Sequence, residues 1–505
     1  MHLINPNNIF ILLKRISVLI AFIIISMHAS VMYAGVNSFG EENSWFRIHN
    51  VGKKTAEVEI FFYDEFGKMI AEDGCNITSQ CKNIGPEKSR TFFQQSKEDI
   101  EIGFRGSAFV TSTQPFVTLM GRDAFKNDKF QIAGDTLRLL PNGPNQILPI
   151  VISDTDFTSR ISIQNLNKEN TGCMELLIYS INGLIDTNNF LPINNELCPN
   201  GGISIMPRSS ITIDENFFSK FENFDGFGII YARTSGEGFL AEDQSYMATI
   251  ETRENFGAGL TQYRSIDFEE TSTDIVLPVA DKNSFEQGRY WDVKFRIVNK
   301  NVSSLNKINF LFQGVDDEKN YYEFEHSLTI TEMLTCDLRL WNQSDCIPND
   351  VPFIDSFRGT VRIKGEKEIA VVAQLFSSNN LIGDYRGFSS EEASRQIFMP
   401  VLNKGYGPFG GSQGWNSSFR LFTFDGQAST IKQFYFSNKQ GNIDAPSQLI
   451  NREESFIQSN NSLLPNKWVG SGYIVADKPV VAVVYLMNEN FKGDNLIMYN
   501  SVSLE

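Results

Sequence analysis

The chain has 505 residues, of which 41% are hydrophobic, and its 60 acidic and 44 basic side chains give a formal net charge of −16. This length exceeds what a single hydrophobic core usually holds, and the hydrophobic content excludes a mainly disordered chain. The negative charge argues against nucleic acid and anionic lipid as partners, because both carry charge of the same sign.

The first 34 residues are predicted to be a secretory signal peptide. They contain no acidic residue, and Lys14 and Arg15 directly precede the apolar run 16–25. This run is too short to cross a bilayer comfortably, and small residues follow it, so we expect cleavage near Ala34. An uncleaved membrane anchor is the alternative. No later segment reaches about 18 consecutive apolar residues, so we expect a mature chain without a membrane span, secreted or held at the cell surface or in the periplasm.

A short sequence pattern recurs four times along the chain: an aromatic residue, one variable residue, a glycine and a β-prone run. Its glycines are spaced by 120, 133 and 111 residues, at Gly106, Gly226, Gly359 and Gly470. A period this long indicates repeated domains rather than a solenoid. We predict that each glycine begins a late strand, where a side chain would meet a neighbouring backbone or an unfavourable backbone angle.

Each repeat contains short β-prone runs separated by turn residues. In the first repeat these runs are 45–50, 56–64, 84–93, 104–111 and 115–120. The later repeats open one strand earlier, with a proline at Pro149, Pro278 or Pro400. Their further runs are 160–165, 175–183 and 205–213, then 295–299 and 308–313, then 418–422 and 433–441. Alternating apolar and polar residues within these runs predict strands with one buried face.

Six or seven short strands in each repeat, without a convincing amphipathic helix, predict an all-β fold of four tandem immunoglobulin-like β-sandwiches. The expected domains are 35–145, 146–273, 274–395 and 396–505, after the signal peptide 1–34. Polar connectors near 127–146, 249–274 and 379–396 suggest sandwiches joined end to end as an elongated spacer. Three repeats end with a tyrosine in similar surroundings, at Tyr263, Tyr385 and Tyr499.

These landmarks resemble the tandem Ig-like β-sandwich repeats of bacterial secreted and cell-surface proteins. The resemblance is carried by the opening 277–279, the segment 415–418, the strand that ends at Asn299, the turn 179–183, and the closing run 106–112 with Pro115. Repeats two and three depart from it, with Ser235 and Glu368 where the closing proline stands. The resemblance implies an extracytoplasmic architectural or binding module, and it supplies no catalytic residue.

The six cysteines fall as one pair in each of the first three repeats. This distribution predicts disulfides within each repeat and an oxidising compartment, with the pairs Cys75 and Cys81, Cys173 and Cys198, and Cys336 and Cys346. A zinc site would need more ligands at close spacing than the chain offers. No metal and no cofactor is therefore expected, although calcium held between domains by several loops stays open.

The sequence contains no motif that pairs a nucleophile with a base. His49 ends an early strand and His326 lies in another, so a hydrolase would have to combine unrelated positions. Runs of carboxylates such as 316–318 are typical of a solvated face in so acidic a chain. Trp341 differs from the other tryptophans because it lies between Cys336 and Cys346, in a loop expected to be closed by a disulfide, and it is the candidate binding residue.

We therefore predict a non-enzymatic exported protein that acts as a surface, matrix or adhesion module, with a protein or glycan at a cell surface as its partner. A carbohydrate-binding protein is the alternative, and a secreted hydrolase comes last.

Overall fold

The computed structural model describes residues 28–32, 42–74, 83–94, 100–101, 104–126, 129–137, 143–180, 183–185, 196–198, 201–221, 223–236, 238–407, 414–488 and 492–504. Strands dominate these residues, with one short α-helix, α2 (Glu215–Phe218), and a few 3-10 turns. The predicted all-β sandwich class is confirmed. No helix among the described residues is long and apolar enough to cross a membrane.

The strands fall into four groups along the chain, which we call repeats one to four. Repeat one forms two four-stranded sheets, ordered β1-β6-β3-β4 and β5-β2-β7-β8. Its strands are β1 His28–Met32, β2 Glu42–Asn50, β3 Val58–Asp64, β4 Met69–Gly74, β5 Ser89–Phe93, β6 Gly106–Ser112, β7 Phe116–Lys126 and β8 Lys129–Leu137.

Repeat two forms one ten-stranded sheet along the path β12-β11-β15-β9-β10-β16-β17, with β13, β14 and β18 paired at its sides. Its strands are β9 Gln146–Ser153, β10 Phe157–Asn165, β11 Gly172–Ser180, β12 Gly183–Ile185, β13 Ile203–Ile205, β14 Ser210–Ile213, β15 Phe224–Arg233, β16 Tyr246–Glu254, β17 Leu260–Arg264 and β18 Ile266–Asp267.

Repeats three and four share one plan, in which a single 20-residue strand takes part in both layers. In repeat three the strands are β19 Ser272–Leu277, β20 Ser284–Glu286, β21 Arg289–Asn299, β22 Asn306–Val315, β23 Tyr321–Ile330, β24 Met333–Asp337, β25 Arg358–Ser377, β26 Ile382–Arg386 and β27 Phe388–Ser389. In repeat four they are β28 Ser394–Lys404, β29 Asn416–Thr423, β30 Ser429–Ser437, β31 Gly441–Asp444, β32 Gln448–Ile450, β33 Glu453–Ile457, β34 Trp468–Met487, β35 Leu496–Asn500 and β36 Val502–Ser503.

The four recurrent glycines share one environment, at or near the starts of β6, β15, β25 and β34. A Cβ at any of them would collide with a carbonyl oxygen of the neighbouring strand, and also with the aromatic ring two residues earlier in the chain. The ring therefore packs over the glycine, where no side chain fits. The colliding carbonyls belong to Tyr63, Tyr179, Gln313 and Phe436.

The recurrent prolines and tyrosines are two ends of one contact. In repeats two to four, the tyrosine hydroxyl donates to the backbone carbonyl of the residue after the proline and accepts from the N–H of that same residue. The pairs are Tyr263 with Ile150, Tyr385 with Val279 and Tyr499 with Val401. All three hydroxyls are buried, and burial raises the pKa of each phenol.

Among its described residues, repeat one has neither the proline nor the tyrosine of this contact. By its pairing with β7, Asp135 of β8 takes the position that Tyr263 takes against β16. In repeats two to four, the strand that opens the repeat pairs with the strand of the recurrent glycine: β9 with β15, β19 with β25 and β28 with β34. In repeat one, β1 takes this position beside β6. β1 lies inside the predicted signal peptide, which remains a prediction, so cleavage near Ala34 would remove this strand.

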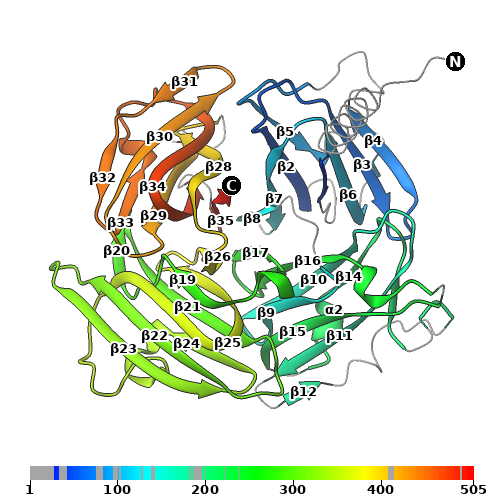
Figure 1. Cartoon of the computed structure of the whole chain (residues 1–505), viewed down its shortest axis with the longest axis horizontal. Helices are drawn as coiled ribbons and strands as arrows, with labels where there is room; N and C mark the ends of the chain where they lie inside the picture. Colours follow the sequence, from blue (N-terminus) through cyan, green and yellow to red (C-terminus); the bar gives the residue numbers. More distant parts are fainter. Residues whose placement is uncertain are drawn as a thin grey trace, which may run out of the picture.

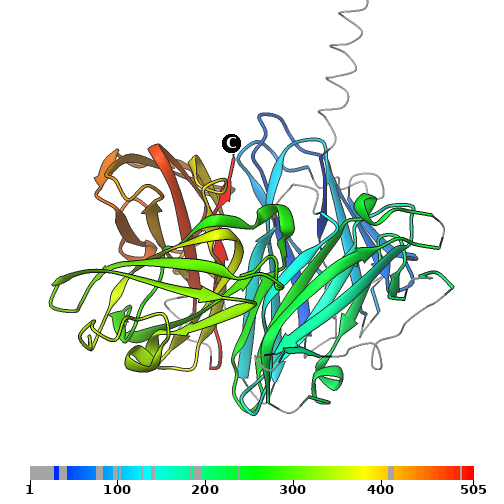
Figure 2. The same cartoon turned by 60° about the horizontal axis from the view of Figure 1, so that its bottom comes forward.

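The four repeats are arranged as a ring (Figures 1 and 2). One strand from each repeat lies at the centre, and each central strand contacts its two neighbours in the cyclic order β8, β17, β26, β35. The hydrophobic cores also cross every junction, because each core includes residues of the next repeat around the ring. The core of repeat one includes Met247 of repeat two, and the core of repeat two includes Val298, Ala370 and Val372 of repeat three. The core of repeat three includes Tyr485 and Met498 of repeat four, among others, and the core of repeat four includes Trp45, Leu119 and Ile132 of repeat one.

Asp494 joins three of the central strands through their first residues. Its carboxylate accepts backbone N–H bonds from Leu260 at 2.9 Å, from Ile382 at 3.2 Å and from Leu496 at 3.2 Å. Elsewhere among the central strands, Asp135 of β8 accepts from the N–H of Arg264 in β17 at 2.9 Å, and Asn500 of β35 donates to the carbonyl of Arg386 in β26 at 2.8 Å. The prediction of an elongated spacer with independent domains is therefore wrong, because the connectors bring the repeats side by side into one packed body.

Replacing Tyr385 by Phe should lower the free energy of unfolding by about 1–3 kcal/mol, because it leaves the N–H and C=O of Val279 buried without a partner. Chemical denaturation measures this change. Tyr290→Phe, at a half-exposed tyrosine, is the control and should be nearly neutral. Equal stability of the two variants would show that this contact contributes nothing.

The buried carboxyl of Asp384 should make the free energy of unfolding depend on pH. Burial raises the pKa of this carboxyl to about 7. Neither oxygen has a hydrogen bond of good geometry to any described residue, although Gln374 and Thr261 approach closely enough to favour the charged form. The folded state therefore holds a proton that the unfolded chain loses near pH 4, so the contribution of Asp384 to stability falls as the pH rises from about 4 to 7.

Asp384→Asn removes this titration. Its unfolding free energy minus that of the wild type should rise between pH 4.5 and pH 8 by on the order of a few kcal/mol. Denaturation at four pH values gives this difference, with the exposed Asp156→Asn as the control. A difference that stays constant with pH would contradict the assignment.

Candidate functional site

Ion pairs fasten three of the four junctions of the ring. Between repeats one and two, Arg122 contacts Glu42 and Glu251, and Arg160 lies 3.1 Å from Glu42. Arg296 of repeat three pairs with Asp225 of repeat two. Arg420 of repeat four pairs with Asp281 of repeat three, through two bonds of 2.7 and 2.8 Å.

The fourth junction, between repeats four and one, is built differently, and we call it the seam. No peptide connection crosses it, and the contacts that we find there among the described residues are hydrogen bonds rather than ion pairs. Lys88 Nζ donates to the Ser437 carbonyl at 3.0 Å, and the Ser89 N–H donates to Asn438 Oδ1 at 3.1 Å. The Asn438 amide returns a bond to the Ser89 carbonyl.

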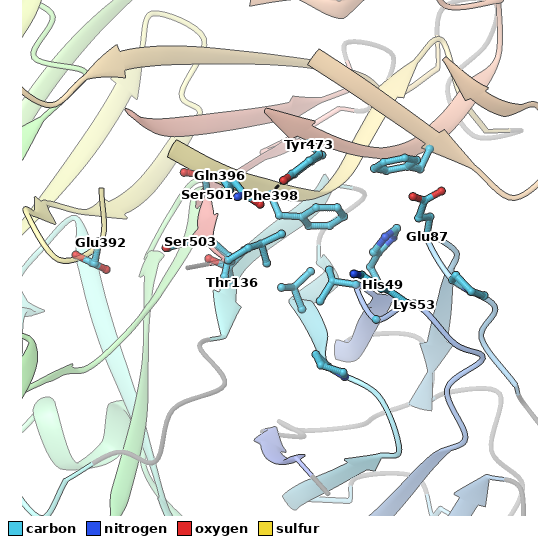
Figure 3. A pocket seen from close by; sticks show the side chains of 18 of the residues that line it. His49, Lys53, Glu87, Thr136, Glu392, Gln396, Phe398, Tyr473, Ser501 and Ser503 are labelled. Carbon is cyan, nitrogen blue, oxygen red and sulfur yellow. Dashed lines mark hydrogen bonds between the residues drawn. The ribbon is translucent and has the colours of Figure 1, made fainter. Parts of the chain in front are cut away.

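A cavity of about 830 Å³ lies along this seam (Figure 3). Its lining comes from strands and turns of repeats one and four and from the end of repeat three. The apolar part includes Val51, Pro115, Val117, Phe398 and Phe436, and the polar part includes Lys53, Glu87, Arg386, Glu392 and Tyr473. This volume falls in the range of sites that hold a small organic molecule.

His49 from β2 lies at the cavity beside Phe398 from β28, with their ring centroids 4.4 Å apart (Figure 3). Strand alternation explains its position, because Phe46 and Ile48 point into the core of repeat one while Trp45 and His49 face repeat four. Burial, and then the nearby charges of Arg47 and Lys88, hold the pKa of His49 well below its usual range. The imidazole is therefore neutral near pH 7.

His49 Nδ1 also lies 3.2 Å from the hydroxyl of Ser471. This pair could not be predicted from the sequence, because its members are 422 positions apart. Ser471 is fully buried in β34 and is absent from the cavity lining, so a substrate in the cavity would not reach its hydroxyl. His326, the other histidine considered, lies on β23 away from the seam and contacts the Asp345 carbonyl at 2.9 Å.

Trp341 lies in the core of repeat three rather than at the surface. Its side chain is 1% exposed, its ring contacts Phe324 and Phe357, and Lys282 lies over one face. The indole ring is therefore packed into the core, in contrast to the expectation of a binding residue in the disulfide-closed loop.

The disulfides Cys173–Cys198 and Cys336–Cys346 each lie within one repeat, with their Cα atoms 5.7 Å apart. Cys75 and Cys81 lie outside the described residues, so their predicted pairing stays a prediction. Among the described residues no group of three or more histidine, cysteine, aspartate or glutamate side chains could hold a metal ion.

Comparison with protein-family models finds no match, and comparison with curated proteins finds none either. Among solved structures, the chain is similar to the Thermotoga maritima protein 1070, with 17% identity over 22% of this chain and 90% of that one, at a TM-score of 0.18. The major pilin SpaD of Corynebacterium diphtheriae matches with 8% identity over 69% of this chain and 86% of that one, at a TM-score of 0.17.

A tetra-tandem repeat from the extending region of a large adhesion protein matches with 9% identity over 95% of this chain and 99% of that one, at a TM-score of 0.09. Similarities this weak carry no argument about function. The candidate site is therefore argued from its own residues.

Asn438→Ala should weaken the seam, because it removes both bonds to the Ser89 backbone and leaves that buried backbone without its partner. We expect a loss of about 1–3 kcal/mol in the free energy of unfolding, and faster hydrogen exchange at the Ser89 amide. Asn442→Ala, which removes one bond to exposed Glu87, is the matched control. Unchanged exchange at Ser89 would show that the seam does not depend on Asn438.

Proposed function

We propose that this chain is an exported, non-enzymatic binding protein of the cell surface, in which four β-sandwich repeats form a rigid ring and the seam cavity is the binding site. The observation that carries the proposal is the cavity itself, about 830 Å³ in volume, at the junction that no peptide connection crosses and where we find no ion pair among the described residues. The other junctions are fastened by ion pairs between carboxylates and arginines.

The lining supports binding rather than catalysis. It combines aromatic, proline and aliphatic side chains with charged and hydroxyl-bearing ones, and such a mixture can hold a ligand by shape and orient it by hydrogen bonds. A hydrolase built on the His49 and Ser471 pair would need the Ser471 hydroxyl open to substrate, and that residue is fully buried. In this proposal the ring takes the place of the elongated spacer, and the surface or adhesion role rests on the molecule that the cavity binds.

Carbohydrate binding is the second candidate. Phe436 and Tyr473 are half-buried aromatic residues of the cavity lining, and aromatic faces beside polar groups suit the apolar faces of sugar rings. A glycan array and a small-molecule library, screened on the same protein, separate these two classes of ligand.

The test of the site itself uses thermal shift with a variant that fills the cavity. Val51→Trp places a large ring in the cavity while its backbone bond to Pro115 remains, whereas Val475→Trp adds the same ring on the exposed surface of β34. Ligands that raise the melting temperature of the wild type should act equally on Val475→Trp and should lose their effect on Val51→Trp. Ligands that stabilise all three proteins alike would overturn the assignment of the cavity.

A further inference from the structure

A second pocket, of about 320 Å³, lies within repeat four, and we call it the repeat-four pocket. Its lining comes from β30, the segment 445–448, β33 and the turn that follows β33, on the outer side of the ring (Figure 1). No described residue lines both this pocket and the seam cavity. The alternation of β30 explains this separation, because Phe436 faces the seam whereas Gln433 and Tyr435 face the repeat-four pocket.

Two polar residues of this pocket occupy positions that are apolar in the other repeats. The pairing with the strand of the recurrent glycine defines these positions, because Gln433 pairs with the fourth residue after Gly470, and Tyr435 with the second. Six buried apolar residues take the same two positions in repeats one to three. They are Ile60, Leu176 and Phe310 at the position of Gln433, and Phe62, Ile178 and Phe312 at that of Tyr435.

Repeat three shows a further difference on the facing strand. β24 and β33 are equivalent, because each pairs with the strand that carries the Phe-Arg sequence. By this register Leu338 corresponds to Gln458, and both side chains are buried. The segment after β24 also brings Trp341 into the core, whereas the segment after β33 contributes Asn461 to the pocket lining. Repeat three therefore packs apolar side chains at positions where repeat four presents amides.

Hydrogen bonds between side chains hold these polar groups in place. The Tyr435 hydroxyl donates to Gln433 Oε1, and the Asn461 amide donates to the Tyr435 hydroxyl at 3.0 Å and to Gln458 Oε1 at 2.9 Å. Gln433 is only 5% exposed, and its Nε2 has no acceptor among the described residues. A buried amide donor without an acceptor is unfavourable, so a ligand that brings an oxygen to this nitrogen gains a hydrogen bond at little desolvation cost.

The lining favours a neutral ligand that is rich in hydroxyl groups. None of the described residues that line the pocket carries a charge, although 21% of the residues in the chain are charged. A charged ligand would lose its hydration here without meeting a counter-charge. Amides and hydroxyls can both donate and accept, as the hydroxyls of a sugar do, and the half-buried Phe456 adds apolar surface on which a sugar ring can pack.

We infer that the repeat-four pocket is a binding site for one neutral sugar unit, held by the side-chain amides of Gln433, Gln458 and Asn461. The volume of the pocket lies at the lower end of the range for small-molecule sites, which suits a single sugar ring. This site is separate from the seam cavity, so the inference does not rest on the proposed function, and either can fail without the other.

The experiment compares neutral sugars with charged sugars of the same ring. The methyl glycosides of glucose, galactose and mannose are each titrated against the folded protein, with binding followed by saturation-transfer difference NMR. Each is paired with its methyl uronide, in which a carboxylate replaces the primary alcohol. We expect at least one neutral glycoside to bind in the millimolar range, and roughly tenfold more tightly than its uronide.

Variants assign this binding to the repeat-four pocket. Gln433→Leu combined with Tyr435→Phe introduces residues that other repeats carry at these positions, so this double variant should remain folded and should lose the binding. Gln440→Leu, at an exposed glutamine in the turn after β30, and Val51→Trp, in the seam cavity, should leave the binding unchanged. The comparison of each glycoside with its uronide uses the wild type alone, so the test does not depend on the double variant remaining folded.

The possible results separate the two sites. No binding of any of the three glycosides, or equal binding of each glycoside and its uronide, would overturn the inference and leave the proposed function of the seam cavity as it stands. Binding that the folded double variant retains would also overturn it. If Val51→Trp then abolished that retained binding, the sugar would be assigned to the seam cavity instead.

Discussion

The arrangement of the whole molecule depends on the four central strands, β8, β17, β26 and β35, which contact one another in a closed cycle. Backbone N–H groups at the first residues of three of these strands meet the single carboxylate of Asp494. Since buried N–H groups need partners, this one side chain fixes the strand starts relative to each other. The cores that cross each junction then hold the outer sheets in place.

Local features of the fold could be predicted from the sequence. The recurrent glycines, prolines and tyrosines gave the period, and the structure supplies a physical reason for each. The aromatic ring packs over the glycine, and the tyrosine hydroxyl bonds to the backbone just after the proline. The closed arrangement of the four repeats could not be predicted, because residues that face a neighbouring repeat, such as Trp45 and His49, alternate along the strand in the same way as residues that face solvent. Trp341 shows the same limit, since a tryptophan between two cysteines packs into the core as readily as it projects from a loop.

The seam cavity could not be predicted from the sequence either, because the turns and strand ends that line it are hundreds of residues apart. One signal was nevertheless present. The sequence Phe-Arg followed by Ile or Leu occurs in three repeats, and two of these arginines form ion pairs, Arg296 with Asp225 and Arg420 with Asp281. At the positions of these two acids, repeat four has Val469 and Asn403. Such a difference between repeats is informative, because the repeats share one fold and their equivalent positions can be compared directly. Here the departure coincides with the junction at which we find no ion pair among the described residues, whereas ion pairs join the other three.

The central claim is that the four repeats form one closed body, and the radius of gyration of the mature protein in solution tests it most directly. Small-angle scattering should give a value near the roughly 23 Å expected for a compact chain of this length. It should also stay unchanged as the ionic strength rises, because the central strands and the shared cores hold the ring as well as the ion pairs do. A value far above this, as expected for four sandwiches strung end to end, would contradict the ring and with it the seam and its cavity.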